Sequence, residues 1–230
     1  QTCALPIFPA SLAALDAVIG YSRTGRAGTS PRESPPAGPT PHMAARTDRK
    51  VTTGYCWRFD PMARRIRQWI ADGLLGEIIH FEGRMTAGGA WRYIRDHAPW
   101  MLEAAQAGGP MQNLGVHWID LFHWWTGLEA VAVQGRATRF GGEPERTIED
   151  CACAVLEYAN GATGLLDISY SAPRSFPQGR DLFVSIRGTL GMVNWVPSWG
   201  GDDNNVLLVT EHPSVGDRKV QVIKEPGGTK

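Results

Sequence analysis

The sequence lacks an excess of charge of either sign and any long apolar run. Lysine plus arginine and aspartate plus glutamate number 23 each, so the net charge gives no reason to expect a nucleic-acid or membrane partner. No apolar run reaches the roughly 18–20 residues of a membrane-spanning helix, and the first residues carry no basic segment typical of a secretory signal. We therefore expect a cytoplasmic protein, and 230 residues suffice for one large domain or two small ones.

Cysteine is also scarce, and the usual metal-binding spacings are missing. The four cysteines are Cys3, Cys56, Cys151 and Cys153, and they form no CxxC pair. Cys151 and Cys153 are two residues apart, which places both on one face of a strand. We expect them to be small buried hydrophobic residues in a reducing compartment, and without a CxxC or HExxH pattern we predict no metal site.

Residues 1–50 and 51–230 differ in composition. Between Tyr21 and Lys50 the chain is rich in Arg, Pro, Gly, Ser and Thr, with five prolines between 31 and 41 and few apolar anchors. Such a segment buries too little surface to offset its ordering entropy, so we expect disorder there. The first residues, QTCALPI, also back-translate to a sequence that resembles a library adapter, so residues 1–50 carry no functional prediction.

From residue 51 onward the pattern predicts two helices followed by strands. Asp60 as N-cap and Pro61 at the first position indicate the start of a helix that ends at Gly73 or Gly76. Asn160 and Gly161 indicate a hairpin turn. The expected elements are strands at 51–56 and 77–85, a helix within 60–76, a decorated loop at 87–107, a helix within 108–127, and strands within 130–140, 150–158, 162–171, 180–196, 205–210 and 219–225. This order predicts an α+β fold, an open and mostly antiparallel β-sheet with helices packed on one face.

A polar stripe on an otherwise apolar helix is the main candidate site. In GGPMQNLGVHWIDLFHWWTG (108–127), helical spacing puts Asn113, His117 and Asp120 within a narrow arc and leaves His123 to one side. Three interpretations compete: satisfied core residues, a metal site, or a general base at His117 with Asn113 orienting it or the substrate. In the last one, Gly115 leaves room for a flat ligand against the helix. Spacing alone does not choose among them.

Five short motifs, in the same order, resemble those of one family. They are GYCWRFDP (54–61), DGLLGEI (72–78), GGPMQNLGVHWIDLFHWWTG (108–127), EDCACAVLEYANGATGLLDIS (149–169) and IRGTLGMV (186–193). Together they resemble the second domain of the glucose–fructose oxidoreductase/inositol dehydrogenase/MocA (Gfo/Idh/MocA) family of NAD(P)-dependent oxidoreductases. The resemblance covers about 140 residues and implies a substrate-binding and oligomerisation domain at 51–230.

The resemblance also implies roles for individual residues. His117 would exchange a proton with a substrate hydroxyl, while a hydride passes between that carbon and the nicotinamide of NAD or NADP. Asn113 stands where the family usually has Asp, and an amide cannot stabilise an imidazolium by charge. Asp120 would be a supporting or substrate-binding residue, and Tyr55 and Arg58 would lie near the cofactor or the substrate. For Arg58, a surface ion pair is an equally good interpretation.

The implied partners are a small polyol or sugar and further copies of the chain. We expect the aromatic loop, with Trp91, Arg92 and Tyr93, to contact the substrate. The family's GxGxxG loop and its E-K-P motif do not occur in this sequence, so we expect a fragment that binds NAD(P) poorly. The alternative function is a non-catalytic sheet domain for homo-oligomerisation or carbohydrate binding, for which the alternating segments 130–135 and 182–188 would serve.

Overall fold

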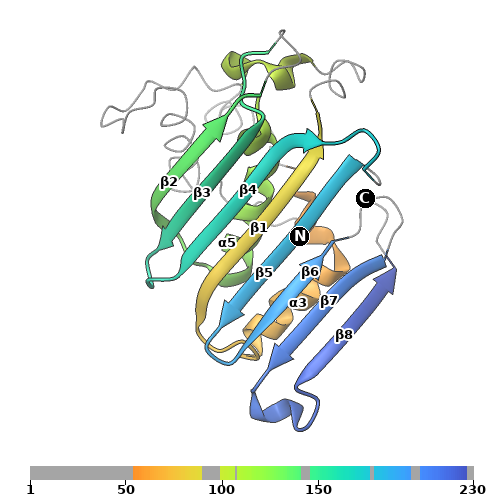
Figure 1. Ribbon diagram of the computed structural model, residues 1–230. Helices are drawn as coiled ribbons and strands as arrows, with labels where there is room; N and C mark the ends of the chain where they lie inside the picture. Colours follow the sequence, from red (N-terminus) through yellow and green to blue (C-terminus); the bar gives the residue numbers. More distant parts are fainter. Residues whose placement is uncertain are drawn as a thin grey trace, which may run out of the picture.

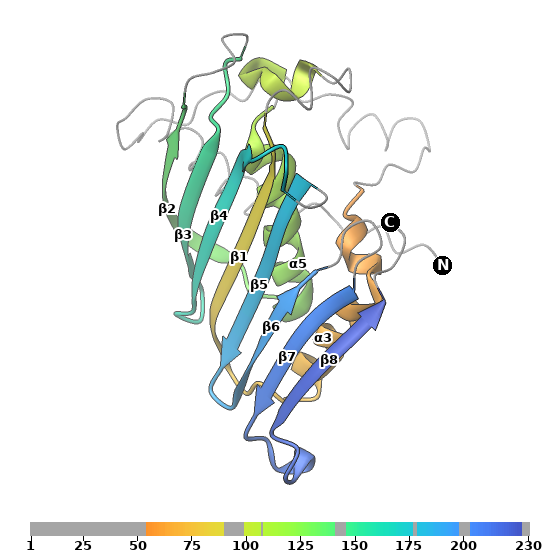
Figure 2. The ribbon, with the colours of Figure 1, turned by 45° about the vertical axis from the view of Figure 1, so that its right-hand side comes forward.

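The described part of the chain folds as one sheet with two α-helices behind it. The computed structural model describes residues 54–89, 99–106, 108–140, 146–176, 179–197 and 203–226. Figures 1 and 2 show α3 and α5 on the same face of the sheet, with the other face uncovered by helices. This arrangement confirms the predicted α+β fold.

The helices and strands follow the predicted order. They are η1 (Cys56–Phe59), α3 (Pro61–Ala71), β1 (Ile78–Gly88), η2 (Pro99–Leu102), η3 (Ala104–Gln106), η4 (Met111–Gly115), α5 (Val116–Thr126), β2 (Ala130–Thr138), β3 (Cys151–Tyr158), β4 (Thr163–Ala172), β5 (Arg180–Gly188), β6 (Gly191–Val196), β7 (Asp203–Thr210), η6 (Pro213–Val215) and β8 (Val220–Pro226). The predicted strand at 51–56 is wrong where the structure describes it, because Cys56 begins the 3-10 helix η1.

The strands of the described residues form an open eight-stranded sheet in the order β2-β3-β4-β1-β5-β6-β7-β8. β1 lies between β4 and β5 and pairs parallel with β4. The other neighbouring pairs are antiparallel, so the prediction of a mostly antiparallel sheet is confirmed. β1 is the first strand along the chain and lies near the middle of the sheet, so the later strands lie on both sides of it.

Helix α3 begins at the predicted residues. The Asp60 side chain accepts hydrogen bonds from the backbone N–H groups of Met62 (2.8 Å) and Ala63 (3.3 Å), and Pro61 occupies the first helical position. Met62 and Ile66 are fully buried, while Trp69 and Ile70 on the same side of the helix pack at the edge of the core. The apolar face therefore fixes α3 to the sheet and leaves its arginines exposed.

The β3–β4 hairpin closes at the predicted Asn160–Gly161 turn. Gly161 has a φ of 84°, and the Asn160 side chain accepts the N–H of Ala162 at 3.1 Å. Burial alternates along both strands. It places Cys151 and Cys153 on the outer face, where Cys153 is exposed, and Cys56 is exposed as well. The prediction that the cysteines are buried is wrong for Cys56 and Cys153, whereas Cys151 is of intermediate exposure. On β3 the neighbours Ala152 and Ala154 take the inward positions.

Large aromatic side chains fill the space between the helices and the sheet. The rings of Trp57 and Trp118 lie 5.0 Å apart, and those of Trp57 and Trp195 lie 5.7 Å apart, so η1, α5 and β6 meet in one cluster. All three tryptophans are at most 2% exposed. Large buried rings contribute much of a core's stability, and here they hold η1 against α5, where the candidate site lies.

Some predictions lie outside the described residues. These are the structure of residues 1–50 and the positions of Trp91, Arg92 and Tyr93. Among the residues that the structure does describe, none of the helices has the length and apolar character needed to cross a membrane.

Candidate active site

The helix of the polar stripe begins with a wider, π-helical turn, η4. The N–H of Val116 reaches the carbonyl of Met111, five residues back, before α5 continues with ordinary α-helical spacing. A Cβ at Gly115 would lie 2.4 Å from the Met111 sulfur and 3.4 Å from Ile168. The prediction that Gly115 leaves room for a flat ligand is wrong, because its own helix and β4 fill that space.

Gly109 fixes the start of this helix against other segments. Its φ of 112° is a conformation that side chains other than glycine rarely adopt, and a Cβ there would lie 2.9 Å from the Glu149 carboxylate. Its carbonyl accepts two hydrogen bonds, from the Asn113 backbone N–H at 3.0 Å and from the Tyr170 hydroxyl at 3.2 Å. Gly109 is thus the point at which η4, β4 and the segment before β3 meet.

The Asn113 amide is held by residues distant in sequence. Its Nδ2 donates to the Tyr170 hydroxyl at 2.7 Å and lies 3.7 Å from the Met101 sulfur. Since the Tyr170 hydroxyl in turn donates to the Gly109 carbonyl, its proton and one lone pair both have assigned partners. The Asn113 nitrogen therefore faces β4, and its carbonyl oxygen lies on the opposite side of the amide.

His117 occupies the first turn of α5, one helical turn after Asn113. Its ring meets the ring of Tyr55 edge-on, with centroids 6.2 Å apart and planes at 86°. The Nδ1 atom is buried, whereas the residue as a whole is partly exposed. The segment preceding η1 and the start of α5 thus jointly form the surroundings of the imidazole.

Arg58 and Asp120, predicted separately, form one ion pair. Nε of Arg58 donates to one carboxylate oxygen of Asp120 at 2.8 Å, and Nη2 donates to the other. The side chains are only 19% and 8% exposed, so the pair is not the surface ion pair considered for Arg58. Such a two-point contact fixes the angle between η1 and α5. The Arg58 guanidinium also lies 5.7 Å from the Tyr55 ring centre.

Burial shifts the acid–base properties of this cluster. It raises the pKa of the Asp120 carboxyl, although the hydrogen bond and charge of Arg58 act in the opposite direction. Burial also raises the pKa of the Tyr55 phenol, and the negative charge of Asp120 adds to the effect. Tyr55 therefore stays protonated at neutral pH and keeps a hydroxyl that can donate a hydrogen bond beside His117.

The structure directs the ring of His123 toward the C-terminal end of α5, one turn beyond Asp120. Its Nδ1 lies 3.0 Å from the Leu128 carbonyl, just beyond the C-terminal end of α5. No group of three His, Cys, Asp or Glu side chains within the described ranges is arranged to hold a metal ion. The cluster at the N-terminal end of the helix, with Asn113, His117 and the Arg58–Asp120 pair, is therefore the candidate site.

Two residues at this site escaped the sequence analysis, Tyr170 and Glu149. Period-two alternation along β4 puts Tyr170 on the inward face with Leu166 and Ile168, and a buried tyrosine hydroxyl needs a polar partner. That signal was present in the sequence. Glu149 is only 9% exposed and gave no such signal, because its closeness to Gly109 spans forty residues of chain.

A family model reproduces the resemblance seen in the motifs. The model of the GFO/IDH/MocA C-terminal domain matches residues 63–194, which is more than half of the chain. The chain belongs to the GFO/IDH/MocA C-terminal domain family. Its η4–α5 helix with Asn113 and His117 lies inside the matched region, whereas Tyr55 and Arg58 precede it.

Curated relatives are similar over part of their length. The "Rhizopine catabolism protein MocA" of Rhizobium meliloti is 28% identical over 169 residues, which cover 72% of this chain and 49% of that protein. The mouse "Glucose-fructose oxidoreductase domain-containing protein 1" is 24% identical over 145 residues, 60% of this chain and 35% of the mouse protein. The chain spans at most about half the length of these GFO/IDH/MocA relatives.

Solved oxidoreductases share the fold. An inositol dehydrogenase homolog from Azotobacter vinelandii, complexed with NAD+, has a TM-score of 0.63 at 20% identity, covering 80% of this chain and 46% of its own. The aldose-aldose oxidoreductase of Caulobacter crescentus, complexed with glycerol, has a TM-score of 0.64 at 21% identity, covering 82% and 51%. At these identities the likeness establishes the sheet-and-helix architecture of the GFO/IDH/MocA C-terminal domain.

Proposed function

We propose that residues 51–230 are the substrate-binding domain of an NAD(P)-dependent oxidoreductase acting on a hydroxyl carbon of a sugar, a sugar acid or an inositol. Membership of the GFO/IDH/MocA family supports an oxidoreductase, and solved neighbours carry NAD+ or glycerol in their names. The observation that carries the proposal is the N-terminal end of the η4–α5 helix. There, a partly exposed histidine follows, by one turn, an amide whose orientation is fixed.

In this proposal His117 acts as the acid and base of alcohol oxidation. A bound NAD(P)+ supplies an acceptor for the hydride that leaves the carbinol carbon. His117 takes the hydroxyl proton in the same conversion, so that the carbinol becomes a carbonyl, and it returns the proton in the reverse direction. Imidazole suits this role because its ordinary pKa lies near neutral pH.

Asn113 and Asp120 would have different tasks. The Asn113 carbonyl oxygen, directed away from Tyr170, can accept a hydrogen bond from a substrate hydroxyl. Both Asp120 oxygens already bind Arg58, so we propose that Asp120 acts on the substrate only through the position of α5. Trp91, Arg92 and Tyr93 remain proposed substrate contacts outside the described residues.

The residues present fit the reacting end of a nicotinamide cofactor better than its phosphates. Tyr55 presents a protonated, half-buried phenol next to His117, which suits contact with a flat ring. Arg58 directs two nitrogens at Asp120, which favours a structural role over phosphate binding. The Gly108–Gly109 pair faces oxygen acceptors, the Met101 carbonyl and the Glu149 carboxylate, and these would repel a phosphate.

The test replaces His117 in a protein that joins this chain to a dinucleotide-binding domain. We expect His117→Ala to lower polyol-dependent reduction of NAD(P)+ by at least about a hundredfold, the usual contribution of a general base. His123→Ala is the matched control, because it removes the same side chain from the same helix at the end away from Asn113. Turnover of His117→Ala equal to that of His123→Ala would contradict the proposal.

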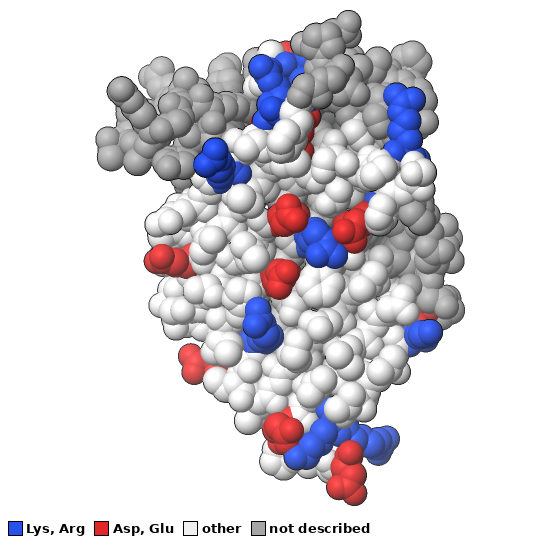
Figure 3. Space-filling view, viewed as in Figure 1, with Lys and Arg blue, Asp and Glu red and all other residues white. Residues whose placement is uncertain are grey.

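A second candidate function, assembly through the uncovered sheet face, has its own support. Val155 and Leu165 are cross-strand neighbours on that face and are 48% and 38% exposed. Figure 3 shows uncharged surface over much of this view, interrupted by charged groups near its middle and by others at its upper end, its sides and its lower tip.

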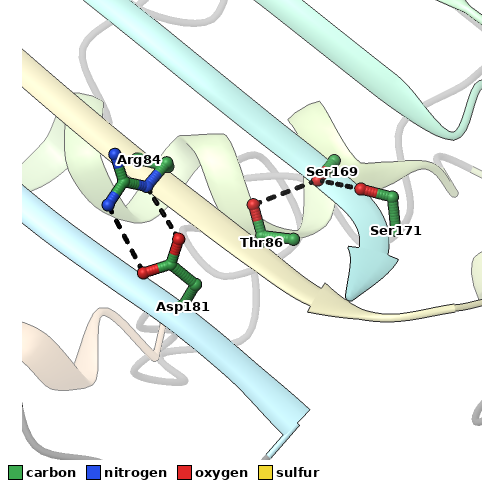
Figure 4. A network of polar contacts seen from close by, with 5 residues as sticks. All are labelled: Arg84, Thr86, Ser169, Ser171 and Asp181. Atoms are coloured by element: carbon green, nitrogen blue, oxygen red, sulfur yellow. Dashed lines mark hydrogen bonds and ion pairs between the residues drawn. The ribbon is translucent and has the colours of Figure 1, made fainter. Parts of the chain in front are cut away.

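Some of the polar groups on that face bind one another. Figure 4 shows Arg84 paired with Asp181 and a chain of hydroxyls from Thr86 through Ser169 to Ser171. Because these groups have partners within the chain, a second copy could cover them without leaving them unpaired. We therefore propose that copies of this chain associate through the face formed by β3, β4, β1 and β5.

A further inference from the structure

An open groove lies on the helical side of the molecule, and its lining includes Arg58 of the candidate active site. It is bordered by η1, α3 and α5 and has a volume of about 560 Å³. This volume falls within the range of small-molecule sites, roughly 300–1,000 Å³. Its lining combines arginines of α3 with the rings of Phe59 and Trp124.

Two of these arginines are held over aromatic rings. The Arg67 guanidinium carbon lies 4.5 Å from the centre of the Trp124 ring, and that of Arg64 lies 5.5 Å from the Phe59 ring. Nε of Arg64 also donates to the Arg58 carbonyl at 3.3 Å. A stacked guanidinium keeps N–H donors at its edge available for a ligand and loses less conformational freedom when it binds one.

Among the residues that the structure describes, no carboxylate neutralises the charges of these two arginines. Arg58 pairs with Asp120, and Arg65 on the same helix pairs with Glu225. Within the described residues, no ion pair joins Arg64 or Arg67 to an acidic side chain. Because the two are three residues apart, they lie next to each other on the helix surface. The groove therefore holds two adjacent, uncompensated positive charges beside exposed aromatic surface.

We propose that this groove binds a phosphomonoester carried on a planar or apolar body. A phosphomonoester has close to two negative charges at neutral pH and enough oxygen atoms to bind two guanidinium groups. A single carboxylate has the charge and the oxygen atoms to bind one. The body of the ligand would cover Phe59, which is 71% exposed, and the ring of Trp124. This groove borders the candidate active site through Arg58, but phosphomonoester binding to Arg64 and Arg67 does not depend on chemistry at His117.

Phenyl phosphate is a suitable probe, because it combines a phosphomonoester with one flat ring. Titration calorimetry with the 230-residue chain at low ionic strength should show phenyl phosphate binding more tightly than phenyl sulfate, which has the same shape and one negative charge. It should also bind more tightly than inorganic phosphate, which has no ring. Affinity should fall as salt is added.

Substitutions of single groove residues test which of them bind phenyl phosphate. Arg64→Gln and Arg67→Gln should each weaken phenyl phosphate about tenfold, as expected for loss of a charge-assisted hydrogen bond. Arg65→Gln is the matched control on the same helix and should change affinity less than twofold, since Arg65 faces Glu225. Phe59→Ser should weaken phenyl phosphate but not inorganic phosphate, and its exposure makes the substitution compatible with folding.

Three results would overturn the proposal. The first is the absence of measurable phenyl phosphate binding at millimolar concentration. The second is equal binding to the unmodified chain and to the Arg64→Gln/Arg67→Gln double variant, with circular dichroism showing both to be folded. The third is tighter binding of tetraglutamate than of phenyl phosphate, which would make the groove a docking surface for acidic polypeptide.

Discussion

At the scale of single residues, two tyrosines on neighbouring strands offer a matched test of the site. Tyr170 and Tyr158 are 3% and 4% exposed. The Tyr170 hydroxyl joins Asn113 to Gly109, whereas the Tyr158 hydroxyl is buried and has no hydrogen-bond partner among the described residues. Burial accordingly raises the pKa of Tyr158. The same change, tyrosine to phenylalanine, should therefore have opposite consequences at the two positions.

We expect Tyr170→Phe to lower the free energy of unfolding by about 1–2 kcal/mol, because two net hydrogen bonds are lost. Tyr158→Phe should leave it unchanged or raise it slightly, since it removes a desolvated hydroxyl. Urea unfolding followed by circular dichroism measures both. Equal losses for the two variants would show that the Tyr170 hydroxyl does not hold the Asn113 amide.

Sequence spacing identified the residues of the site better than their partners. Asn113 and His117 were recognised from one helix, because helical periodicity is a local property. Arg58 and Asp120 were both selected, but their pairing spans 62 positions, and Tyr170 lies 57 positions after Asn113. Contacts over such distances depend on how β4 and η1 pack against α5, which no local pattern specifies.

At the scale of elements, helix starts and hairpin turns could be predicted where they depend on residues adjacent in the sequence. The Asp60–Pro61 helix start and the Asn160–Gly161 turn are both confirmed. In each, the side chain of Asp60 or Asn160 accepts a hydrogen bond from the backbone N–H two residues later, which is a local contact. The π-helical turn η4 was not predicted, since the helical spacing of the sequence does not distinguish it from an α-helical turn. The face of Cys151 and Cys153 likewise depends on the register of β3 with β4, which composition does not reveal.

The parallel β1–β4 pair gives a pH-dependent prediction. His80 on β1 lies 2.8 Å from the Thr163 hydroxyl and opposite Arg187 of β5. Burial, and then the charge of Arg187, lower the pKa of His80 below its ordinary 6.5, while Glu82 has a smaller opposite effect. Protonation of His80 is therefore less favourable in the folded protein than in the unfolded chain.

The stability that His80 contributes should be fully present above pH 6.5. It should be lost as the pH falls through the lowered pKa of the folded state, because the unfolded chain takes up the proton first. Nuclear magnetic resonance titration should give a His80 pKa below 6.5, and Arg187→Gln should raise it part of the way. Arg218→Gln, an exposed change elsewhere, should not. A His80 pKa unaffected by Arg187→Gln would leave burial as the cause.

At the scale of the whole molecule, the sequence predicted the architecture but not the function of each face. Two helices followed by strands implied one covered and one uncovered sheet face, as Figures 1 and 2 show. The alternating segment 182–188 turned out to serve the core, since Leu182, Val184 and Ile186 are buried. In the segment 130–135, Val131 is exposed while Val133 packs against the core. Alternation therefore indicates that a strand has two different faces, without indicating what covers the second.

Association through the uncovered face leads to the last prediction. Leu165 of β4 and Leu190 of the turn between β5 and β6 are both 38% exposed, but only Leu165 lies on that face beside Val155. A lysine at 165 would place a charge where a second copy is proposed to pack, and burying an unpaired charge is costly. In sedimentation velocity, we expect the unmodified chain to sediment as a dimer or a larger assembly. Leu165→Lys should shift it toward the single chain, and Leu190→Lys should not. A single-chain mass for the unmodified protein at micromolar concentration would contradict assembly through this face, and equal dissociation by both lysine variants would place the contact elsewhere.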